Sequence, residues 1–304
     1  MENNEIDLRD LLKLLYEKKR QFILITSFVG ILSIVSAINS PNIYTSHAIL
    51  APSDTDESLS SQLGGLSSLT SFAGIRIPGE VATPAEEAIA RLESFDFYSN
   101  HFLPLIKLED LMAVDKWIPE ENILIYDEKD FDSKKKIWIR DVSFPKTVKP
   151  SEQESYEKFL DHISIEEEGG TAFINISISH KSPFVAKKWL DVIISKINSS
   201  TRDIDINSAN SAISFLSEYS ESTNVKSLKE ASSRLLETQM QKLMLASATD
   251  DYVFKVIESP LVPEEESGPN RILNVIFGLV VGSVMAFLVI ILRNYRSLLG
   301  SKGS

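Results

Sequence analysis

The pattern of apolar and charged residues singles out two stretches near the ends of the chain. Residues 21–40 and residues 272–292 contain no charged side chain. Each is about as long as the roughly 20 residues that a helix needs to cross the apolar core of a bilayer. We therefore expect one transmembrane helix over residues 21–40 and a second over residues 272–292.

The first stretch also allows a different interpretation, a signal peptide that is cleaved after the sequence "VSA" at residues 35–37. The twenty residues before it hold five acidic side chains beside five basic ones. A signal peptide begins with a positively charged segment, so this balance is a poor match. We expect an uncleaved anchor.

Basic residues gather on the outer side of both apolar stretches. They are Lys13, Lys18, Lys19 and Arg20 before the first stretch, and Arg293, Arg296 and Lys302 after the second. Between the stretches, only Arg271 is close to an expected helix. Loops rich in lysine and arginine stay in the cytoplasm. Both termini, residues 1–20 and 293–304, are therefore expected to be cytoplasmic, and the middle of the chain is expected to be exported.

Alternating or continuous apolar residues predict strands in the central part. In residues 171–179, Ile174, Ile176 and Ile178 alternate with polar residues, and the preceding Gly169-Gly170 suits the turn of a hairpin. This strand is expected to have one buried face, as in a sheet covered on one side. Further strands are expected at residues 42–52, 122–126, 136–142 and 251–259, with a loop at residues 53–80.

Helix signals follow a different periodicity. Thr83 and Pro84 suit the N-cap and first position of a helix, with Ala88, Leu92 and Phe95 on its apolar side. A longer helical segment is expected from Ser182 as N-cap and Pro183 as first residue. Its apolar side is formed by Ala186, Leu190, Ile193 and Ile197. Further along, Ser227 and Glu230 match a capping box, followed by Leu228, Leu235 and Leu236.

The long helical segment is expected to fold back on itself. A single rod of about 65 residues would reach roughly 100 Å and carry the strand at 251–259 away from the membrane that the chain enters by residue 272. A turn between Ser199 and Ser227, where apolar residues are sparse, avoids this. The apolar stripes of the two helices are thin, so we expect them to pack against further copies of the chain.

These elements predict an α+β fold in which two terminal transmembrane helices flank an exported α/β base domain with a long helical hairpin. The expected divisions are residues 1–20 (N-terminal segment), 21–40 (first transmembrane helix), 41–182 (first part of the base domain), 183–250 (extended helical arm), 251–271 (last base strand and proline-rich link), 272–292 (second transmembrane helix) and 293–304 (tail).

Charge and composition narrow the possible partners. The whole chain carries a net charge of −12. Residues 21–292 hold 23 of the basic and 38 of the acidic side chains, a net charge of −15. Such a surface disfavours nucleic acid, so the expected partners are membrane lipids and protein. Cysteine is absent, which is compatible with export because a domain of this size buries enough core without disulfides.

No constellation of catalytic residues is found in the sequence. The four histidines, at positions 47, 101, 162 and 180, lack metal-ligand spacing, and no nucleotide-binding or hydrolase motif is present. The acidic run Glu264–Glu266 is interpreted as a solvated loop, and neither apolar stretch contains an ionisable residue. We therefore assign no catalytic, cofactor-binding or metal-binding residue and expect a protein that is not an enzyme.

The candidate functional residues lie at the entrance to the second apolar stretch and inside it. Three prolines there fix the backbone and prevent helix or ladder continuation. Small residues four apart let membrane helices approach closely. These residues are Pro260, Pro263, Pro269, Gly278, Gly282 and Ala286.

This layout resembles the Wzz family of polysaccharide co-polymerases, the chain-length determinants of surface polysaccharides. The resemblance includes "YTSHAILAP" after the first apolar stretch and "HKSP" at the start of the long helices. The family usually has serine directly before the third proline, whereas this chain has Gly268 there and Ser267 one position earlier. The glycine spacing of this chain is also shifted from that of the family, with Gly278 and Gly282 preceding Ala286. These departures leave open which residues of the motif matter.

The resemblance implies a function, a location and partners. It implies a bacterial inner-membrane protein with a periplasmic central domain that sets the modal length of a lipid-linked polysaccharide such as lipopolysaccharide O-antigen. It also implies a ring-like homo-oligomer that works with a membrane polymerase and contacts the lipid-linked polysaccharide, without a cofactor.

Two other protein classes remain as alternatives. One is a two-span sensor or receptor with a periplasmic ligand-binding domain, and the other is a capsule-export co-polymerase that works with a separate cytoplasmic kinase. Each needs a cytoplasmic output or nucleotide-binding part, whereas twelve residues follow Leu292. The sequence therefore favours the chain-length determinant, unless a separate subunit supplies that part.

Overall fold

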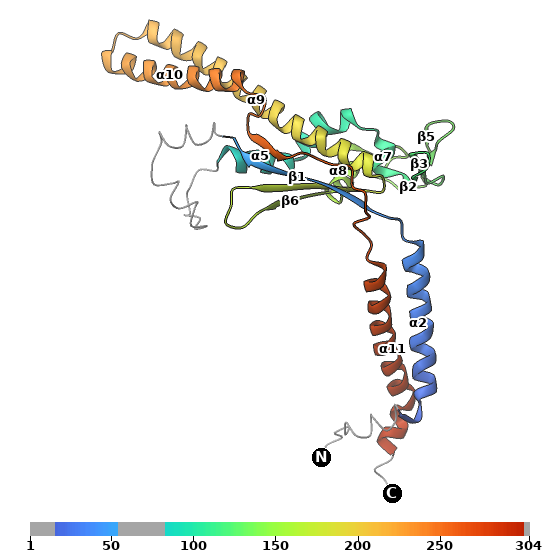
Figure 1. Ribbon diagram of the computed structural model, residues 1–304. Helices are drawn as coiled ribbons and strands as arrows, with labels where there is room; N and C mark the ends of the chain where they lie inside the picture. The colour runs from blue at the N-terminus through green and yellow to red at the C-terminus, as the bar shows by residue number, and fades with distance from the viewer. Residues whose placement is uncertain (1–15, 54–82, 301–304) are drawn as a thin grey trace. The chain divides into compact units, whose positions relative to one another are not determined.

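The computed structural model describes residues 16–53 and 83–300, with side chains to residue 293 (Figure 1). The chain divides into two compact units. Residues 1–43 and 266–304 form the helix-pair unit, and residues 44–265 form the α/β unit. The expected loop at residues 53–80 lies outside the described residues from position 54 onward. Within the described residues the mixed helix and sheet composition confirms the α+β fold class.

The helix-pair unit consists of α2 (Lys19–Asn39) and α11 (Arg271–Gly300), which run side by side in opposite directions (Figure 1). Both are long and apolar enough to cross a membrane. Large apolar side chains cover their outer surfaces, as Phe28 and Phe277 illustrate, with exposed fractions of 64% and 69%. Surfaces of this kind suit lipid rather than water.

The α/β unit is built on a four-stranded antiparallel sheet in the order β6-β7-β1-β8. Its strands are β1 (Tyr44–Pro52), β6 (Ile163–Glu167), β7 (Ile174–His180) and β8 (Phe254–Glu258). Gly170 takes a positive φ of 88° in the β6–β7 turn, a conformation that glycine adopts readily. The alternation predicted for β7 is confirmed, since Ile174, Ile176 and Ile178 are buried.

Helix α9 (Pro183–Ser222) covers the sheet, because its first half packs against β1 and β7. Its predicted apolar side, Ala186, Leu190, Ile193 and Ile197, is completely buried. As predicted, Ser182 is the N-cap residue and Pro183 begins the helix. Ser182 lies at the N-cap without a side-chain capping bond, and its backbone N–H donates to His180 Nδ1 instead.

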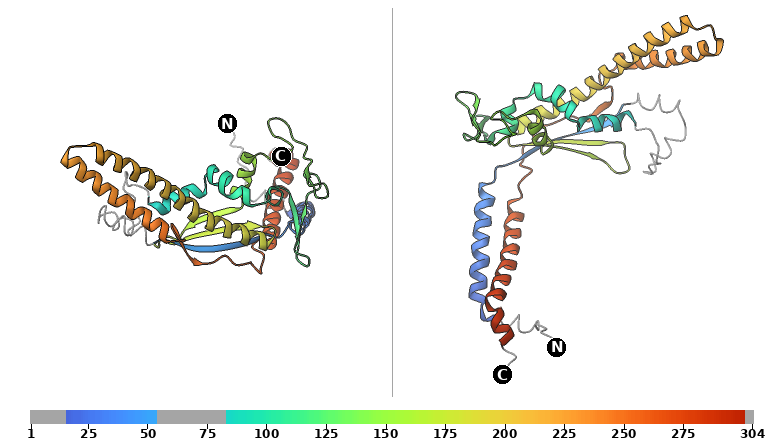
Figure 2. Two further views of the ribbon diagram at one scale, coloured as in Figure 1. Left: turned by 90° about the horizontal axis from the view of Figure 1, so that it is seen from above. Right: turned by 180° about the vertical axis from the view of Figure 1, so that it is seen from behind.

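The second half of α9 pairs with α10 (Lys226–Ala248) to form a helical hairpin that extends beyond the sheet (Figure 2). Its turn, residues 223–225, lies within the predicted range. The predicted capping box of Ser227 and Glu230 is wrong. Helix α10 begins two residues earlier than this box requires, so Val225 occupies the N-cap and Ser227 already lies within the first turn.

Short helices fill the space beside α9. They are α5 (Pro84–Leu92), α6 (Phe95–Phe97), the π-helical turn η1 (Tyr98–Phe102), the 3-10 turn η2 (Leu103–Leu105), α7 (Leu108–Met112) and α8 (Glu152–Leu160). The predicted start of α5 is confirmed by a capping box between Thr83 and Glu86. Phe95 is not part of its buried side: Ser94 caps a new helix, and the Phe95 ring is exposed.

Two small hairpins complete the unit, β2 (Val114–Ile118) with β3 (Ile123–Tyr126), and β4 (Phe131–Asp132) with β5 (Ile137–Trp138). Strand β3 matches the prediction at residues 122–126. The strand expected at 136–142 shrinks to two residues. Beyond it, the Arg140 guanidinium bonds the carbonyls of Thr147 and Val148, so the chain folds as a loop.

Candidate functional site

The proline-rich link begins directly after β8 and lies beside β1. Pro260 is buried, and the buried Ser46 hydroxyl of β1 donates a hydrogen bond of 2.8 Å to the carbonyl of Leu261. Pro263 is half-buried. The first part of the link is therefore attached to the sheet by a polar side chain and cannot move as a free tether.

The link continues in the helix-pair unit, where the segments next to α2 and α11 pair with each other. The Ile43 N–H donates to Gly268 O, and the Ser267 N–H donates to Ile43 O, both at 2.8 Å. Pro269 follows and is half-buried, and the Asn270 carboxamide then accepts the Leu273 N–H at the start of α11. This bridge closes the end of the helix pair.

Arg271 joins the same end of the helix pair through its side chain. Its guanidinium donates to the carbonyl of Ala37 in the last turn of α2, to the Asn42 carboxamide and to the Glu266 carboxylate. The last carbonyls of a helix lack intrahelical partners and favour a positive charge. Arg271 therefore stabilises the end of α2 while it begins α11.

Gly278 and Gly282 lie on the side of α11 that faces α2. A Cβ atom on Gly278 would overlap the Ser33 side chain. On Gly282 it would lie 3.0 Å from Val29 Cβ and 3.3 Å from the carbonyl oxygen of Thr26. The glycines therefore bring the two backbones together within one chain.

The contact continues along both helices through small residues. Gly30 of α2 faces Leu279, whose Cδ2 would be 2.8 Å from an added Cβ. The Ser33 hydroxyl donates to the carbonyl of Asn274 at 2.9 Å, and Ala286 is completely buried. Close backbone approach and a hydroxyl bond are what helices use to associate in lipid, where no hydrophobic drive exists between them.

The structure brings together two histidines that the sequence left apart. The rings of His162 and His180 lie 5.8 Å apart, and both flank Trp189. Burial lowers the pKa of His180 to about 4 and also lowers the pKa of His162. His180 accepts the Ser182 N–H at Nδ1, so Nε2 carries the proton and donates to the Asp110 carbonyl.

The histidine pair is a packing element of the α/β unit. Among the residues that the structure describes, no group of three His, Asp or Glu side chains is arranged to hold a metal ion. The only sequence signal for the pair is that His180 continues the buried alternation of Ile174, Ile176 and Ile178.

A second buried polar contact joins helix α9 to the beginning of strand β8. Asn198 of α9 accepts the N–H groups of Val253 and Phe254 at 3.0 and 2.9 Å, and donates to the Phe254 carbonyl at 2.9 Å. Its side chain is buried. Asn198 thus attaches the helix to the strand that leads into the proline-rich link.

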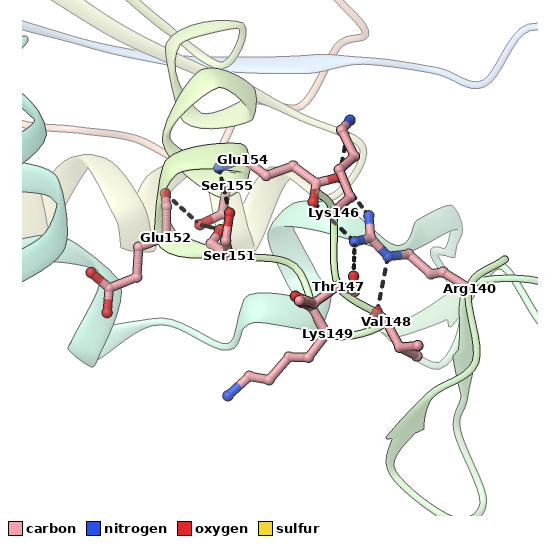
Figure 3. A network of polar contacts seen from close by, with 9 residues as sticks. All are labelled: Arg140, Lys146, Thr147, Val148, Lys149, Ser151, Glu152, Glu154 and Ser155. Atoms are coloured by element: carbon pink, nitrogen blue, oxygen red, sulfur yellow. Dashed lines mark hydrogen bonds and ion pairs between the residues drawn. The ribbon is translucent and has the colours of Figure 1, made fainter. Parts of the chain in front are cut away.

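A third network holds the loop after β5 (Figure 3). Arg140 makes a bidentate pair with Glu154 of α8 at 2.6 and 3.0 Å and also binds the carbonyls of Thr147 and Val148. The guanidinium lowers the pKa of the Glu154 carboxyl. The pair keeps its charges at neutral pH and fixes the course of the loop.

Comparison with known proteins gives a family match over the N-terminal third of the chain. Residues 4–97 match the model of the Wzz family, the chain length determinant protein. One solved structure, described as a full-length bacterial polysaccharide co-polymerase, shares 14% identity over 98% of this chain and 100% of its own, with a TM-score of 0.37. Among curated protein sequences, none matches the chain.

A second solved structure is a fragment of WzzB, a polysaccharide co-polymerase from Salmonella Typhimurium. It shares 14% identity over 75% of this chain and 100% of its own, with a TM-score of 0.29. The part of the chain that the structure describes has two apolar helices, α2 and α11, an α/β unit and a helical hairpin within that unit. The match over residues 4–97 confirms the resemblance to the Wzz family that the sequence predicted.

Proposed function

We propose that the protein sets the modal chain length of a lipid-linked surface polysaccharide, such as lipopolysaccharide O-antigen, without being an enzyme itself. The observation that carries the proposal is the match of residues 4–97 to the chain length determinant family. The two apolar helices and the helical hairpin fit this role, because they provide a membrane anchor and a long surface for assembly.

The proposed location is the bacterial inner membrane, with both termini in the cytoplasm and the α/β unit in the periplasm. The distribution of lysine and arginine supports this orientation. The proposed partners are further copies of the chain in a ring, a membrane polymerase, the lipid-linked polysaccharide and membrane lipids.

The candidate residues Pro260, Pro263, Pro269, Gly278, Gly282 and Ala286 are proposed to couple the exported part to the membrane helices. Support comes from the attachment of Leu261 to Ser46 and from the backbone bridge between Ile43 and Gly268. Both contacts restrain the link, so motion in the α/β unit would be passed to α11 rather than absorbed.

The test is deletion of the gene in the host, followed by electrophoresis of the surface polysaccharide. We expect the modal band cluster to disappear and short chains to dominate, with the parental ladder restored by the gene on a plasmid. An unchanged length distribution in a strain with an active polymerase would reject the proposal. A change confined to capsule would favour the capsule-export alternative.

The orientation is tested separately with reporter fusions at Met1 and Ser304. Phosphatase, which folds only in the periplasm, should be inactive at both positions, and a cytoplasmic fluorescent protein should be active. Phosphatase activity at either end would reject the proposed topology and leave the polysaccharide assay unaffected.

A further inference from the structure

Residues 129–149 of the α/β unit, which we call the basic loop, differ in charge from the rest of the exported part. The basic loop carries seven basic and three acidic side chains, although residues 21–292 together are strongly acidic. Its six lysines are all exposed: Lys129, Lys134, Lys135, Lys136, Lys146 and Lys149. The basic loop thus carries a net charge of +4 within an exported part whose net charge is −15.

The basic loop also exposes large apolar side chains. Ile137, Ile139 and Val148 are each almost half exposed, and Phe144 is 95% exposed. A phenylalanine so completely exposed loses free energy in water unless something covers it. Lysines beside exposed apolar residues are typical of segments that lie in a membrane interface.

These side chains are held by a fixed scaffold. Arg140 binds Glu154 and the carbonyls of Thr147 and Val148 (Figure 3). Lys146 adds a weaker contact to Glu154 at 3.6 Å. The Arg140 and Glu154 side chains are only 10% and 14% exposed, so the pair is largely shielded from water. The loop backbone is therefore ordered before any partner binds.

Aromatic contacts connect the basic loop to Tyr44, the residue at which the chain enters the α/β unit after α2. Tyr44, the first residue of this unit, packs edge-on against Trp117 of β2, which pairs with β3. From β3 the aromatic contacts continue from Tyr126 to Phe131 and on to Trp138. Only four residues, 40–43, lie between the end of α2 and Tyr44, which are therefore at most about 17 Å of extended chain apart.

We propose that the basic loop rests on the surface of an anionic phospholipid bilayer, with its lysines near lipid phosphates and Phe144 in the interface. The exported part as a whole is acidic and repels such a bilayer, so the net positive charge of the basic loop favours close approach at this segment. The proposal rests on α2 and α11 crossing the membrane. It goes beyond the proposed function, because it assigns a lipid-binding role to a soluble segment.

The absence of cysteine from the chain permits a direct test. Phe144→Cys in the full-length protein is labelled with an environment-sensitive fluorophore and reconstituted into vesicles of phosphatidylcholine, with or without phosphatidylglycerol. Lipids that carry a spin-label quencher then report contact. We expect strong quenching of the label at position 144 in the anionic vesicles only.

Two labelled positions serve as references. Leu288→Cys in α11 should be quenched in both kinds of vesicle, and Phe215→Cys in the helical hairpin should be quenched in neither. If Leu288→Cys is not quenched, the membrane placement itself fails. If it is quenched while position 144 is not, only the basic-loop proposal fails.

Charge is tested by adding Lys134→Gln and Lys149→Gln, two exposed lysines outside the Arg140–Glu154 contact, to the labelled protein. Each lysine removed should lower the ratio of docked to undocked loop roughly fivefold, the effect of one basic group near an anionic surface. High salt should act in the same direction. Circular dichroism checks that the fold is retained.

Self-quenching between labels at position 144, without quenching by lipid, would overturn the proposal in favour of a contact between copies. Quenching that is unaffected by phosphatidylglycerol, salt and the lysine substitutions would equally overturn the electrostatic recognition proposed here.

Discussion

At the scale of single residues, space decides the role of the two glycines in α11. An added Cβ on Gly278 or Gly282 would meet Ser33, Val29 or the backbone of Thr26, all on α2. Backbone oxygen cannot move aside as the end of a long side chain can. The glycines therefore set the distance between the two helices, and a larger residue must push them apart.

Gly282→Leu should consequently alter polysaccharide length control without unfolding the α/β unit. Overpacking of a close contact costs about 2 kcal/mol, which is enough to separate or rotate a helix pair. The measurements are the polysaccharide ladder and the amount of protein in the membrane. Leu288→Ile, at an exposed position of the same helix, should leave both unchanged. A parental ladder from normally accumulated Gly282→Leu would show that the glycines are only tolerated.

His180 gives a residue-scale prediction about pH. Its pKa is about 4 in the folded chain, against 6.5 for an unperturbed histidine, because burial disfavours the charged ring. Between these values the unfolded chain binds more protons at this histidine, so the contribution of His180 to stability is fully present above pH 6.5 and is lost as pH falls towards 4. The loss at the acidic end is about 3 kcal/mol.

The measurement is thermal unfolding in detergent across this pH window, followed by circular dichroism. His180→Gln should make the slope smaller, because a neutral amide does not titrate, and the part contributed by His162, whose pKa burial also lowers, should remain. His101→Gln, which removes an imidazole outside this pair, is the matched control and should retain the parental slope. Equal slopes for the parent and His180→Gln would refute the assignment.

At the scale of helices and strands, local patterns predicted the fold well. The alternation in β7, the capping box of α5 and the apolar side of α9 depend on residues close together in sequence. Predictions were wrong where two local signals competed. Ser94 starts a new helix and exposes Phe95, and α10 begins before the apparent capping box at Ser227.

The candidate site was only partly predictable for a related reason. Its prolines and glycines are visible as spacing, but their partners are distant in sequence. Ser46 binds Leu261, and Arg271 binds the Ala37 carbonyl. Each pair is more than 200 residues apart. A single basic residue near the second apolar stretch was the only signal for Arg271, and no pattern indicated which helix the glycines face.

Asn198 provides the prediction at this scale. It satisfies three backbone groups of Val253 and Phe254 in a buried position. Asn198→Ala leaves these groups without partners, which should destabilise the α/β unit by about 3 kcal/mol. Chemical unfolding in detergent measures this change. Asn210→Ala, at an exposed position of the same helix, should change stability by less than about 0.5 kcal/mol. Similar stability for the two variants would refute the proposed attachment.

At the scale of the whole molecule, the helical hairpin exposes large apolar side chains on both of its helices. Phe215, Leu235 and Met244 are each more than half exposed. In contrast, the first half of α9 is buried against the sheet. A two-helix hairpin with thin apolar stripes gains little stability from packing within itself. Further copies of the chain are the partners that the proposed function supplies.

We therefore predict that the full-length protein forms a closed homo-oligomer whose contacts include the hairpin. Its mass in nanodiscs should be a multiple of the 34.0 kDa chain. Replacing Phe215, Leu235 and Met244 together by Glu should shift the mass towards the monomer. Each contact between two copies would then bury carboxylates without a partner of opposite charge, which is unfavourable. The polysaccharide should lose its modal length in the same variant.

The matched control replaces the exposed Ser211, Ser233 and Ser247 by Glu, which adds the same charge to the same helices without removing apolar surface. This serine control should assemble more completely than the variant in which Phe215, Leu235 and Met244 are replaced by Glu. Circular dichroism should give equal helix content for both variants. The comparison separates loss of apolar contact from simple charge repulsion. A parental protein that is monomeric at micromolar concentration would refute the prediction. So would assembly of the Phe215, Leu235 and Met244 variant that is as complete as that of the serine control. In the second case the copies would have to meet through the sheet or the membrane helices.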